Sequence, residues 1–458
     1  MPRRTVVAHP DFGHKLKELR EQHKLSLRRL GGMIHCSHGH LWDLESGIKR
    51  PSISVAVLLD QALEAGGQLS AMVSEVSADT DRRPVAVEQA MVAMPSGLEF
   101  APDWRHGIDV AVDLWRGDMQ RRNLLRQVGF SATAFLPAAM RWLMSSLDER
   151  PAGNGERLIG AADIESVRRM TSTYRTLDNQ FGGGHIRDSL VRFLNADVTE
   201  LINGRYDAAT GRQLLSAVAE TTQLAGWASY DAGMQGLAQR YLIQALRLAA
   251  GAGDRALGAE ILAAMSHQAA YLRASGEAVD LAKAASRAAA EAGIAAIEAE
   301  SAVLEAQGHA VGGDEKACAA ALNRAEAIFD KADRTSEPQW IGYFDESYLA
   351  AKFGHCFTAL GRGDIAARFA ARSLDMDGQQ YARGRQFNLV LLAVAHAQSG
   401  ELEEAARVGI DAVEAAEGLY SSRARDYLTD LADRLSKHVG LPAVQEFAER
   451  ARPVLASA

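Results

Sequence analysis

The sequence predicts an all-α protein, with a small helical unit at its N-terminus and a long body of helical repeats behind it. Three observations support this fold class. In the first 64 residues, apolar side chains recur at helical spacing between capping and turn residues. From about residue 160 to the end, Ala- and Leu-rich helical segments follow one another. Within that body glycines recur every 36–49 residues, an interval typical of stacked helical hairpins.

Bulk composition limits what the chain can be. Its 458 residues exceed one ordinary core, so two or three domains are expected, and 47% hydrophobic residues indicate a globular chain. No apolar run approaches the ~18 residues of a membrane span, and the N-terminus lacks the apolar core of a signal peptide. We therefore expect a cytoplasmic protein without a membrane partner. The three cysteines lie far apart, which suits a reducing compartment.

The net charge of −8 is spread unevenly along the chain. Residues 1–77 carry ten Lys and Arg against eight Asp and Glu, so this part is +2 and the remainder is −10. A chain that coats nucleic acid along its whole length is thereby excluded. Only the N-terminal part is suited to phosphate contacts.

The stretch from Leu25 to Gly47 predicts two short helices around a tight turn. Ser26 and Ser37 stand where N-caps stand, and Gly47 follows the second helix as a C′ residue would. A helix on either side supplies further inward positions. The apolar residues expected to form this small core are Phe12, Leu16, Leu19, Leu27, Leu30, Ile34, Leu41, Leu44, Val55, Leu58, Leu59 and Leu63.

Over residues 12–64 the chain resembles the Cro/C1-type helix-turn-helix domain of the xenobiotic-response-element (XRE) regulator family. The family pattern is met by Leu25, Ser26, Leu30, Ser37, Leu41, Leu44, Glu45, Gly47 and Pro51. Three positions depart from it: Leu27 replaces a frequent Gln, Gly31 replaces a small Ala, and His35 replaces the turn Gly. The resemblance implies a lambda-repressor-like fold with a somewhat altered grip on DNA.

By the same resemblance, the second helix of the pair enters the major groove of double-stranded DNA. His38, Gly39 and Asp43 are expected to face bases, and an Asp can accept a hydrogen bond from cytosine N4. The resemblance also implies a structural pair between Arg20 and Glu45. The remaining implied DNA-binding residues are Ser37, His40 and Trp42 at or near the backbone, and Lys49 and Arg50 at phosphates.

Two other kinds of site are not expected. His35, Cys36, His38 and His40 permit a metal site, but on a helix His38 and His40 point about 200° apart, and no second Cys or His pair stands at zinc-finger spacing. We expect no metal and no cofactor. Catalysis is not expected either, because the glycines 182–184 lack the Lys-Ser/Thr ending of a phosphate loop and no HExxH or CxxC occurs.

Two breaks divide the chain. Residues 65–100 lose helical periodicity and collect Gly, Ser, Pro and Asp, and residues 151–155 read PAGNG. Amphipathic segments between them predict connector helices whose aromatic side packs on a neighbouring domain; a second basic DNA contact through Arg121 and Arg122 is the alternative. The predicted parts are a helix-turn-helix domain over 1–75, a linker with connector helices over 76–155, and a helical repeat domain over 156–458.

Five helical hairpins are predicted in the body, beginning near Leu224, Ile261, Glu298, Tyr348 and Asn388. The glycines expected in their turns are Gly233, Gly276, Gly312, Gly361 and Gly400. This arrangement resembles a tetratricopeptide-repeat (TPR) α-solenoid, although the hallmark Trp, Tyr and Pro positions are poorly kept. An insertion at 335–340 lengthens the interval between Gly312 and Gly361.

Small residues at facing positions let the helices of such a solenoid approach closely, and its curvature leaves a concave groove that commonly binds peptides. For each candidate taken singly, packing or solvation is the competing and more frequent role. The residues expected to line the groove are Ser266, Arg273, Phe387, Asn388, Val390, Val394 and Gln398, with His396 nearby.

A DNA-reading head joined to a helical-repeat body resembles two groups of bacterial proteins. These are actinobacterial regulators, favoured by the Ala- and Gly-rich usage, and the peptide-pheromone receptors of low-GC bacteria. The combination predicts a sequence-specific transcriptional regulator, acting as a homodimer, whose repeat domain mediates dimerisation and senses a peptide, small molecule or protein partner. The alternative is a tetratricopeptide interaction scaffold in which the head serves as a docking module.

Overall fold

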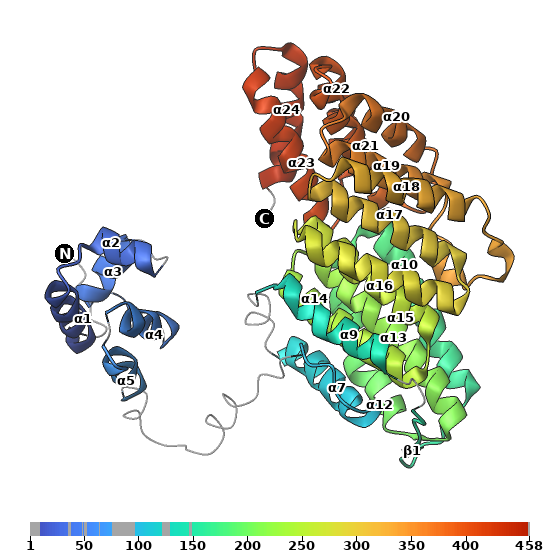
Figure 1. Cartoon of the computed structure of the whole chain (residues 1–458), viewed down its shortest axis with the longest axis horizontal. Helices are drawn as coiled ribbons and strands as arrows, with labels where there is room; N and C mark the ends of the chain where they lie inside the picture. Colours follow the sequence, from blue (N-terminus) through green and yellow to red (C-terminus); the bar gives the residue numbers. More distant parts are fainter. Residues whose placement is uncertain are drawn as a thin grey trace. The chain divides into compact units, whose positions relative to one another are not determined.

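The computed structural model describes residues 10–34, 38–47, 49, 53–63, 65–75, 97–120, 129–145 and 149–456. The chain divides into two compact units, residues 1–94 and residues 95–458 (Figure 1). Among the described residues the secondary structure is helical apart from one two-residue strand pair and one isolated bridge. The predicted fold class, a helix-turn-helix head followed by an α-solenoid, is confirmed.

The described residues of the first unit form five helices around one small core. They are α1 (Pro10–Gln22), α2 (Leu27–Met33), α3 (His38–Glu45), α4 (Ile53–Ala62) and α5 (Gln68–Glu75). Ser26 caps α2 as predicted, since its side-chain oxygen accepts from the backbone N–H of Arg29 at 3.2 Å. Leu58 is an exception among the predicted core residues, because its side chain is exposed. The core residues are Phe12, Leu16, Leu19, Leu30, Ile34, Leu41, Leu44, Ala56, Leu59, Leu63, Ala65 and Leu69.

Among the described residues, the second unit begins with two helices from the stretch expected to form a connector. These are α7 (Trp104–Gln120) and α9 (Phe135–Met144), which follows a short 3₁₀ turn at Ala132–Ala134. Helix α7 contacts α11 and α14, and α9 contacts α14 and α16. Trp115 and Trp142 are fully buried in the main core of this unit. Both helices therefore form part of the repeat body and are not a free linker.

A pair of helices precedes the repeats. Helix α10 (Ala161–Phe181) leads into α11 (Gly183–Phe193), which continues through the π-helical Leu194–Val198 into α12 (Thr199–Ile202). Strands β1 (Gly153–Asn154) and β2 (Arg205–Tyr206) pair antiparallel, with Gly153 opposite Tyr206. This short ladder joins the segment before α10 to the segment just before α13, the first helix of the hairpins.

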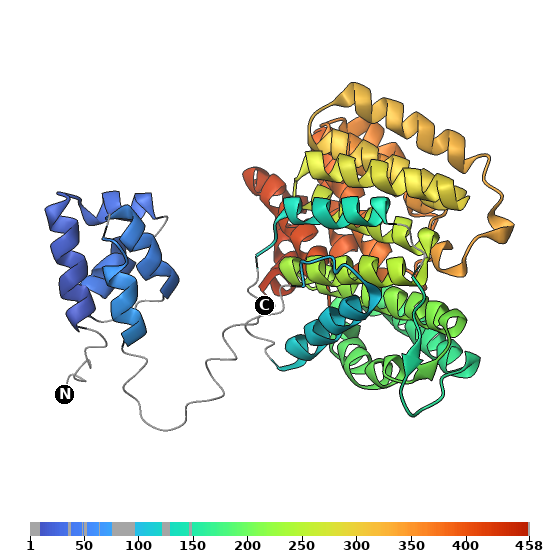
Figure 2. The ribbon, with the colours of Figure 1, turned by 60° about the horizontal axis from the view of Figure 1, so that its bottom comes forward.

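Twelve helices then form six consecutive hairpins, which follow a curved path from the green to the red helices (Figure 2). Two 3₁₀ turns, Arg334–Ser336 and Gln339–Ile341, lie in the predicted insertion, and a third, Ser436–His438, follows α23. The helices are α13 (Ala208–Asp231), α14 (Gln235–Ala252), α15 (Arg255–Tyr271), α16 (Ser275–Ala292), α17 (Ala295–Val311), α18 (Glu315–Phe329), α19 (Glu346–Ala359), α20 (Gly363–Ser373), α21 (Ala382–Gln398), α22 (Leu402–Ala415), α23 (Ser422–Leu435) and α24 (Pro442–Ala456).

Each of the five predicted hairpin turns contains one residue at positive φ. Gly233, Gly361 and Gly400 occupy this position as expected, with φ of 80°, 74° and 82°. The prediction for Gly276 is wrong, because this residue lies in the first turn of α16 and Arg273 (φ 61°) takes the positive φ in that hairpin. Gly312 lies in the predicted turn, but its neighbour Gly313 (φ 80°) has the positive φ. In these two hairpins, the residue with positive φ lies three positions before Gly276 and one position after Gly312. In the second hairpin an Arg bears the cost of a conformation that favours Gly.

The three consecutive glycines of the second unit permit close helix packing. Gly182, at φ 89°, separates α10 from α11. A Cβ on Gly183 would lie 2.6 Å from the carbonyl oxygen of Ala228, and one on Gly184 would lie 2.7 Å from that of Tyr420. These are distances that real side chains do not adopt, so glycine is required for the contact of α11 with α13 and with the segment before α23.

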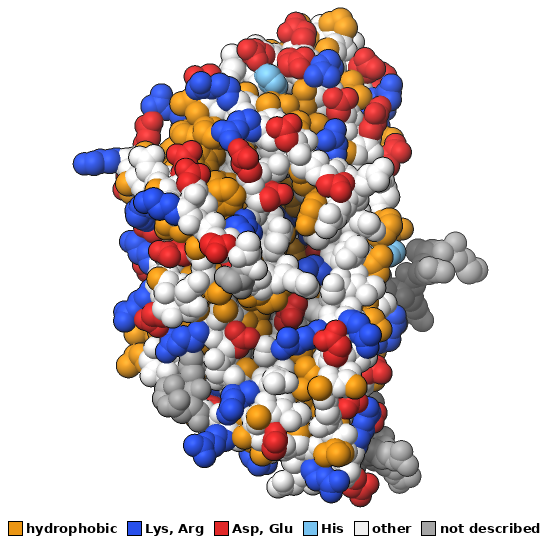
Figure 3. Space-filling view, turned by 90° about the vertical axis from the view of Figure 1, so that its right-hand side faces the viewer, with side chains coloured by type: hydrophobic (Ala, Val, Ile, Leu, Met, Phe, Trp, Pro, Cys, Tyr) orange, Lys and Arg blue, Asp and Glu red, His pale blue; other side chains and the backbone are white. Residues whose placement is uncertain are grey.

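The surface of the second unit in Figure 3 mixes basic and acidic side chains, and no single type of side chain dominates the face shown. In the part of the chain that the structure describes, no helix combines the length and the apolar character needed to span a membrane.

Candidate nucleic-acid interface

Helix α3 presents one face to the core of the head and the other to solvent. Leu41 and Leu44 are fully buried. The end of α3 also lies very close to α1: a Cβ on Gly13 would be 2.6 Å and 2.7 Å from the carbonyl oxygens of Glu45 and Leu44. Gly13 therefore sets the approach of α1 to α3. Helical periodicity did not single out this residue, since glycine carries no apolar side chain to count.

Arg20 and Glu45, the two residues expected to pair, form a bidentate ion pair. Arg20 Nε lies 2.5 Å from Glu45 Oε1, and Arg20 Nη2 lies 3.0 Å from Glu45 Oε2. Arg20 Nη1 also donates to the carbonyl oxygen of Leu25 at 2.9 Å. The hydrogen bonds to Glu45 raise the pKa of Arg20 above its ordinary value. One guanidinium thus joins the end of α3 to α1 and to the turn before α2.

The outer face of α3 carries side chains that the fold of the head does not bury. His38 and Gly39 are exposed, and the Trp42 side chain is 54% exposed. His38 and Trp42 are four residues apart, as are Gly39 and Asp43, so the four positions form two adjacent rows on one side of the helix. A Cβ placed on Gly39 would meet nothing within 4 Å. This surface is available for contact with a partner.

A charged pair stands at the end of this surface. Lys49 Nζ lies 2.8 Å from Asp43 Oδ2. The chain reverses between them at Gly47, whose φ of 67° agrees with the predicted C′ role, and the backbone N–H of Lys49 donates to the carbonyl oxygen of Asp43 at 3.3 Å. Lys49 therefore offsets the negative charge of Asp43, which would otherwise repel a phosphate backbone.

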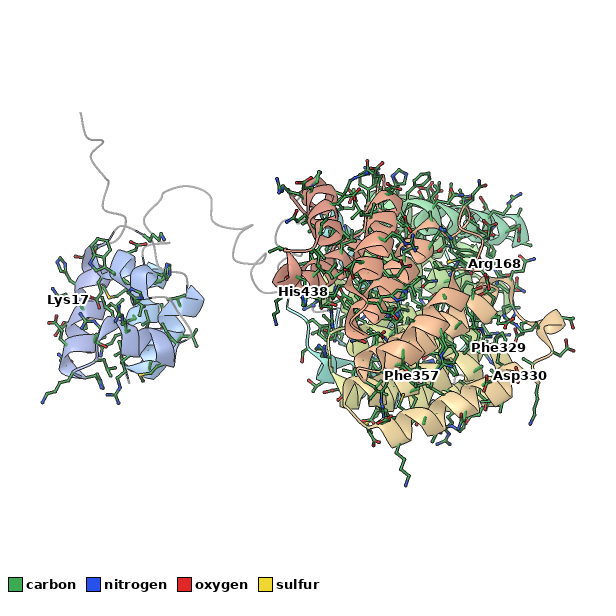
Figure 4. The ribbon with its side chains drawn as sticks, turned by 90° about the horizontal axis from the view of Figure 1, so that it is seen from above. Lys17, Arg168, Phe329, Asp330, Phe357 and His438 are labelled. Atoms are coloured by element: carbon green, nitrogen blue, oxygen red, sulfur yellow. The ribbon has the colours of Figure 1, made fainter. Side chains whose placement is uncertain are left out.

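Of the other predicted DNA-binding residues of the head, only some lie within the described residues. His40 is half-buried on α3. Ser37 and Arg50, together with His35 and Cys36, lie outside the described residues. Sequence analysis did not single out the exposed basic residues Arg28 and Arg29 on α2, which precede the turn, or Lys17 on the outer side of α1 (Figure 4). Their exposure is evident only once the buried faces of α1 and α2 are known.

Asp60 is a further structural residue that sequence analysis missed. Asp60 is buried, and its carboxylate accepts hydrogen bonds from the backbone N–H groups of Leu69 and Ser70, each at 2.8 Å. Those two groups belong to the first turn of α5, whose N–H donors lack partners within the helix. Asp60 thus caps α5 from α4. The sequence gives little indication of this cap, because Asp60 lies nine and ten residues before the two N–H groups that it accepts from, Leu69 and Ser70.

The predicted groove residues of the repeat body do not form one surface. Ser266, Asn388, Val390 and Val394 are buried in helix packing, and the Ser266 hydroxyl donates to the carbonyl oxygen of Ala278 at 2.7 Å. The expectation of an open groove is therefore not met at these four positions. Helix α21 contacts α10, α19, α20, α22 and α23, so every residue from Asn388 to Ala395 is buried. The groove prediction assumed that one face of α21 is left uncovered by its neighbours.

The three other candidates have separate roles. Arg273 lies in the turn after α15, and the half-buried Gln398 donates to the carbonyl oxygen of Thr358 at 3.0 Å. The neighbouring His396 lies 2.5 Å from Glu401 Oε2. Phe387 alone lies in a cluster of polar and aromatic groups, with its ring 5.1 Å from that of Tyr427. The candidates thus lie at different places in the repeat body.

Sequence analysis also missed a buried acid pair inside the repeats. Tyr343, from the insertion before α19, has its hydroxyl 2.9 Å from Glu260 Oε1 and 2.8 Å from Glu300 Oε2. A phenol carries one proton, so it bridges two carboxyl groups only if one of them is itself protonated. Burial, and then the proximity of Glu260, raises the pKa of Glu300 to about 8. Burial lowers the pKa of the nearby Lys352 to about 7.

Comparison with known proteins agrees with the geometry of the head. A family model described as a helix-turn-helix domain matches residues 11–71. No curated protein matches the chain. The matched range covers α1 to α4 and the start of α5, and it contains all of α3. The match supports a helix-turn-helix DNA-binding regulator.

Proposed function

We propose that this protein is a sequence-specific transcriptional regulator of the XRE type, which places the outer face of α3 in the major groove of DNA. The observation that carries the proposal is the outer face of α3, on which His38, Gly39 and Trp42 are exposed. Behind it, α3 is held rigidly by buried Leu41 and Leu44 and by the Arg20–Glu45 pair. A rigid helix with a free polar face is what base readout requires.

Within this proposal each side chain has a chemical role. His38 and Asp43 face base edges, with the Asp43 carboxylate accepting from cytosine N4, while Gly39 lets the helix backbone approach the base pairs. Ser37, His40 and Trp42 lie at or near the sugar-phosphate backbone. Lys49 and Arg50 contact phosphates. The salt link from Lys49 to Asp43 supports this arrangement, because it keeps the acid locally neutral as the phosphates approach.

The repeat domain, residues 156–458, is proposed to dimerise the protein and to sense a peptide, small molecule or protein partner. A single small head buries only ~600–1,000 Å² on DNA, too little for tight specific binding. Two heads on an inverted repeat supply the rest. A ligand then regulates DNA binding by favouring one arrangement of the repeat domains over another, which requires unequal affinity for the two.

The test is recovery of DNA by the purified full-length protein from sheared DNA of its host. The binding is done at ~150 mM salt, which suppresses plain phosphate attraction. Enrichment of a few fragments that share an inverted repeat is expected. The double variant His38→Ala/Asp43→Ala should lose this preference. Its matched control is Asp11→Ala/His14→Ala, which removes the same two residue types from exposed positions on α1.

Unselective recovery, or selectivity that both double variants keep, would refute readout by α3. It would favour the second class of function, an interaction scaffold with the head as a docking module. Because all four substituted residues lie on the surface or in surface ion pairs, folding of the variants is expected to be normal and is checked by circular dichroism.

A further inference from the structure

One arginine of the C-terminal hairpin is surrounded by aromatic rings of distant repeats. Arg423, near the start of α23, is 3% exposed. Its guanidinium carbon lies 4.4 Å from the ring centroid of Tyr230, with further rings at 4.8–5.6 Å. All are within the range of a cation–π contact. The aromatic cage is formed by Trp227 and Tyr230 of α13, Tyr271 of α15 and Phe387 of α21.

The guanidinium of Arg423 contacts these rings, and it also forms a side-chain hydrogen bond with Tyr427. Arg423 Nε and Nη1 donate no hydrogen bond to any residue that the structure describes, although Nη1 lies 3.7 Å from Asp231 Oδ1. A planar guanidinium stacks on aromatic faces and is weakly hydrated, whereas an ammonium is compact and strongly hydrated. The cage is therefore chemically selective for the side chain of arginine over that of lysine.

The cage lies where the last helices of the solenoid meet the first. Arg383 of α21 forms two 2.8 Å bonds to Asp178 of α10, and it lies 3.3 Å from Asp231. The Ser421 hydroxyl, just before α23, donates to Asp231 Oδ1 at 2.9 Å. The ends of the repeat body are thus joined by charged and polar contacts around the cage.

The triple glycine is part of the same junction. The backbone N–H of Gly184 donates to the carbonyl oxygen of Tyr420 at 2.8 Å, and that of Tyr420 donates to the carbonyl oxygen of Phe181 at 2.7 Å. A surface pocket of about 610 Å³ opens beside it, lined by Gly184, residues 416–422 and Arg425 among others. The start of α23 is therefore reached from solvent along this pocket.

We propose that the aromatic cage with Asp231 is a guanidinium-binding site, filled in this structure by the chain's own Arg423, and that an arginine-bearing peptide binds the repeat domain by displacing Arg423 and the first turn of α23. The inference rests on the ligand-sensing role proposed above and names the ligand class. Asp178 is paired with Arg383, but Asp231 lies 3.7 Å from Arg423, and an incoming guanidinium takes over this contact when Arg423 leaves. Asp426 Oδ2 accepts from the Tyr271 hydroxyl at 2.6 Å, so it belongs to the wall of the cage.

The first test empties the cage in the full-length protein. Arg423→Ala is expected to lower the melting temperature of the repeat domain, and ethylguanidinium should bind the variant with a Kd of about 1 mM and restore several degrees. Ethylammonium at the same concentration should not, and neither compound should shift the wild type. Equal effects of the two cations on Arg423→Ala would overturn guanidinium selectivity.

The second test uses the wild type and a milder variant. Acetyl-Gly-Arg-Gly-amide should speed hydrogen exchange at the start of α23, in residues 422–427, and its Lys counterpart should not. Arg423→Gln, which keeps most of the side-chain volume and serves if Arg423→Ala does not fold, should bind the Arg peptide about tenfold more tightly than the wild type because the resident competitor is weakened. No Arg-over-Lys preference in either protein would refute the proposal. Recovery of DNA by Arg423→Gln is measured in parallel, so loss of this inference is distinguished from loss of the DNA-binding function.

Discussion

The single substitution Glu45→Ala should destabilise the head strongly, because it removes the carboxylate that pairs with Arg20. In Glu45→Ala, Arg20 loses both of its bonds to the carboxylate and keeps the carbonyl oxygen of Leu25 and the exposed Glu21, 3.6 Å away. The Arg20 and Glu45 side chains are 13% and 7% exposed. Breaking a fully buried pair costs about 3–5 kcal/mol. Because Arg20 retains these contacts and some solvent, about 2–3 kcal/mol is expected here.

That cost is large against the stability of a domain of this size, about 3–10 kcal/mol. The assay is hydrogen exchange of the full-length protein at pH 7, read on the residues of α1 and α3, because exchange separates the head from the repeat domain. A double-mutant cycle with Arg20→Ala isolates the pair: the double variant should cost less than the sum of the single variants by about 2 kcal/mol.

The head offers a matched control for this cycle. Lys15 and Glu18 form an exposed ion pair on α1, 3.1 Å apart, with side chains 32% and 54% exposed. Glu18→Ala should change stability by less than about 0.5 kcal/mol, since exposed pairs contribute little. If Glu45→Ala changes exchange no more than Glu18→Ala does, or if the cycle is additive, the idea that this pair locks α3 in place is refuted.

Three further predictions concern other residues. Lys49→Ala should weaken binding to all recovered DNA fragments to a similar degree and reduce the slope of log K against log salt by about 1, whereas a loss confined to one sequence would contradict a phosphate contact. Arg273→Gly removes a non-glycine residue from φ 61° and should stabilise the repeat domain by about 0.5–1 kcal/mol in denaturant titrations; destabilisation would show that the Arg side chain contributes more than the backbone costs. The third concerns pH. Glu300, whose pKa is raised to about 8, stabilises the fold through its protonated form, and this contribution is complete at low pH and is lost as pH rises toward 8. Lys352, whose pKa is lowered to about 7, stabilises through its neutral form and loses that contribution as pH falls through 7. Between pH 5.5 and 7 the Glu300 effect therefore dominates the pH change, and Glu300→Gln should gain up to about 2 kcal/mol relative to the wild type over that interval. A constant difference between the two proteins at both pH values would exclude a protonated Glu300.

The sequence predicted the head well because its determinants are local. Ser26 caps the helix that it precedes, Gly47 ends the helix that it follows, and Leu41 and Leu44 share a face through helical spacing alone. The Arg20–Glu45 contact joins residues 25 positions apart, and it came from a family pattern. Neither Gly13 nor Asp60 was found, because the role of each depends on which backbone atoms of another helix lie opposite it.

For the repeat body, the sequence predicted the helices but not which of their faces are buried. Its helices and most of its turns follow from local patterns, but which faces remain open depends on how the curved stack closes on itself. Arg383 and Asp178 are 205 positions apart, and no spacing rule connects them. Asn388 of α21 was expected at a groove, but its side-chain amide donates to the carbonyl oxygen of Ser373, at the end of α20, at 3.1 Å. This contact depends on how the chain returns from α20 to α21, which helical spacing does not specify.

Closure of the stack also constrains how the proposed sensor works. A peptide cannot add to the cage while Arg423 fills it, so its net affinity is its intrinsic affinity multiplied by the fraction of molecules in which Arg423 has left. The buried Leu428, Leu431 and Leu435 hold most of α23 in the apolar core, whereas its start is held by the cage and by the hydrogen bond from Ser421 to Asp231. Opening confined to the first turn of α23 leaves the three leucines in place, so the apolar faces of the last hairpins do not have to separate. The energetic difference between the closed and open forms is then set by few residues, and Arg383→Gln should raise the affinity for an arginine peptide even though Arg383 touches none of the cage rings. Unchanged affinity in Arg383→Gln would mean that opening is not part of binding.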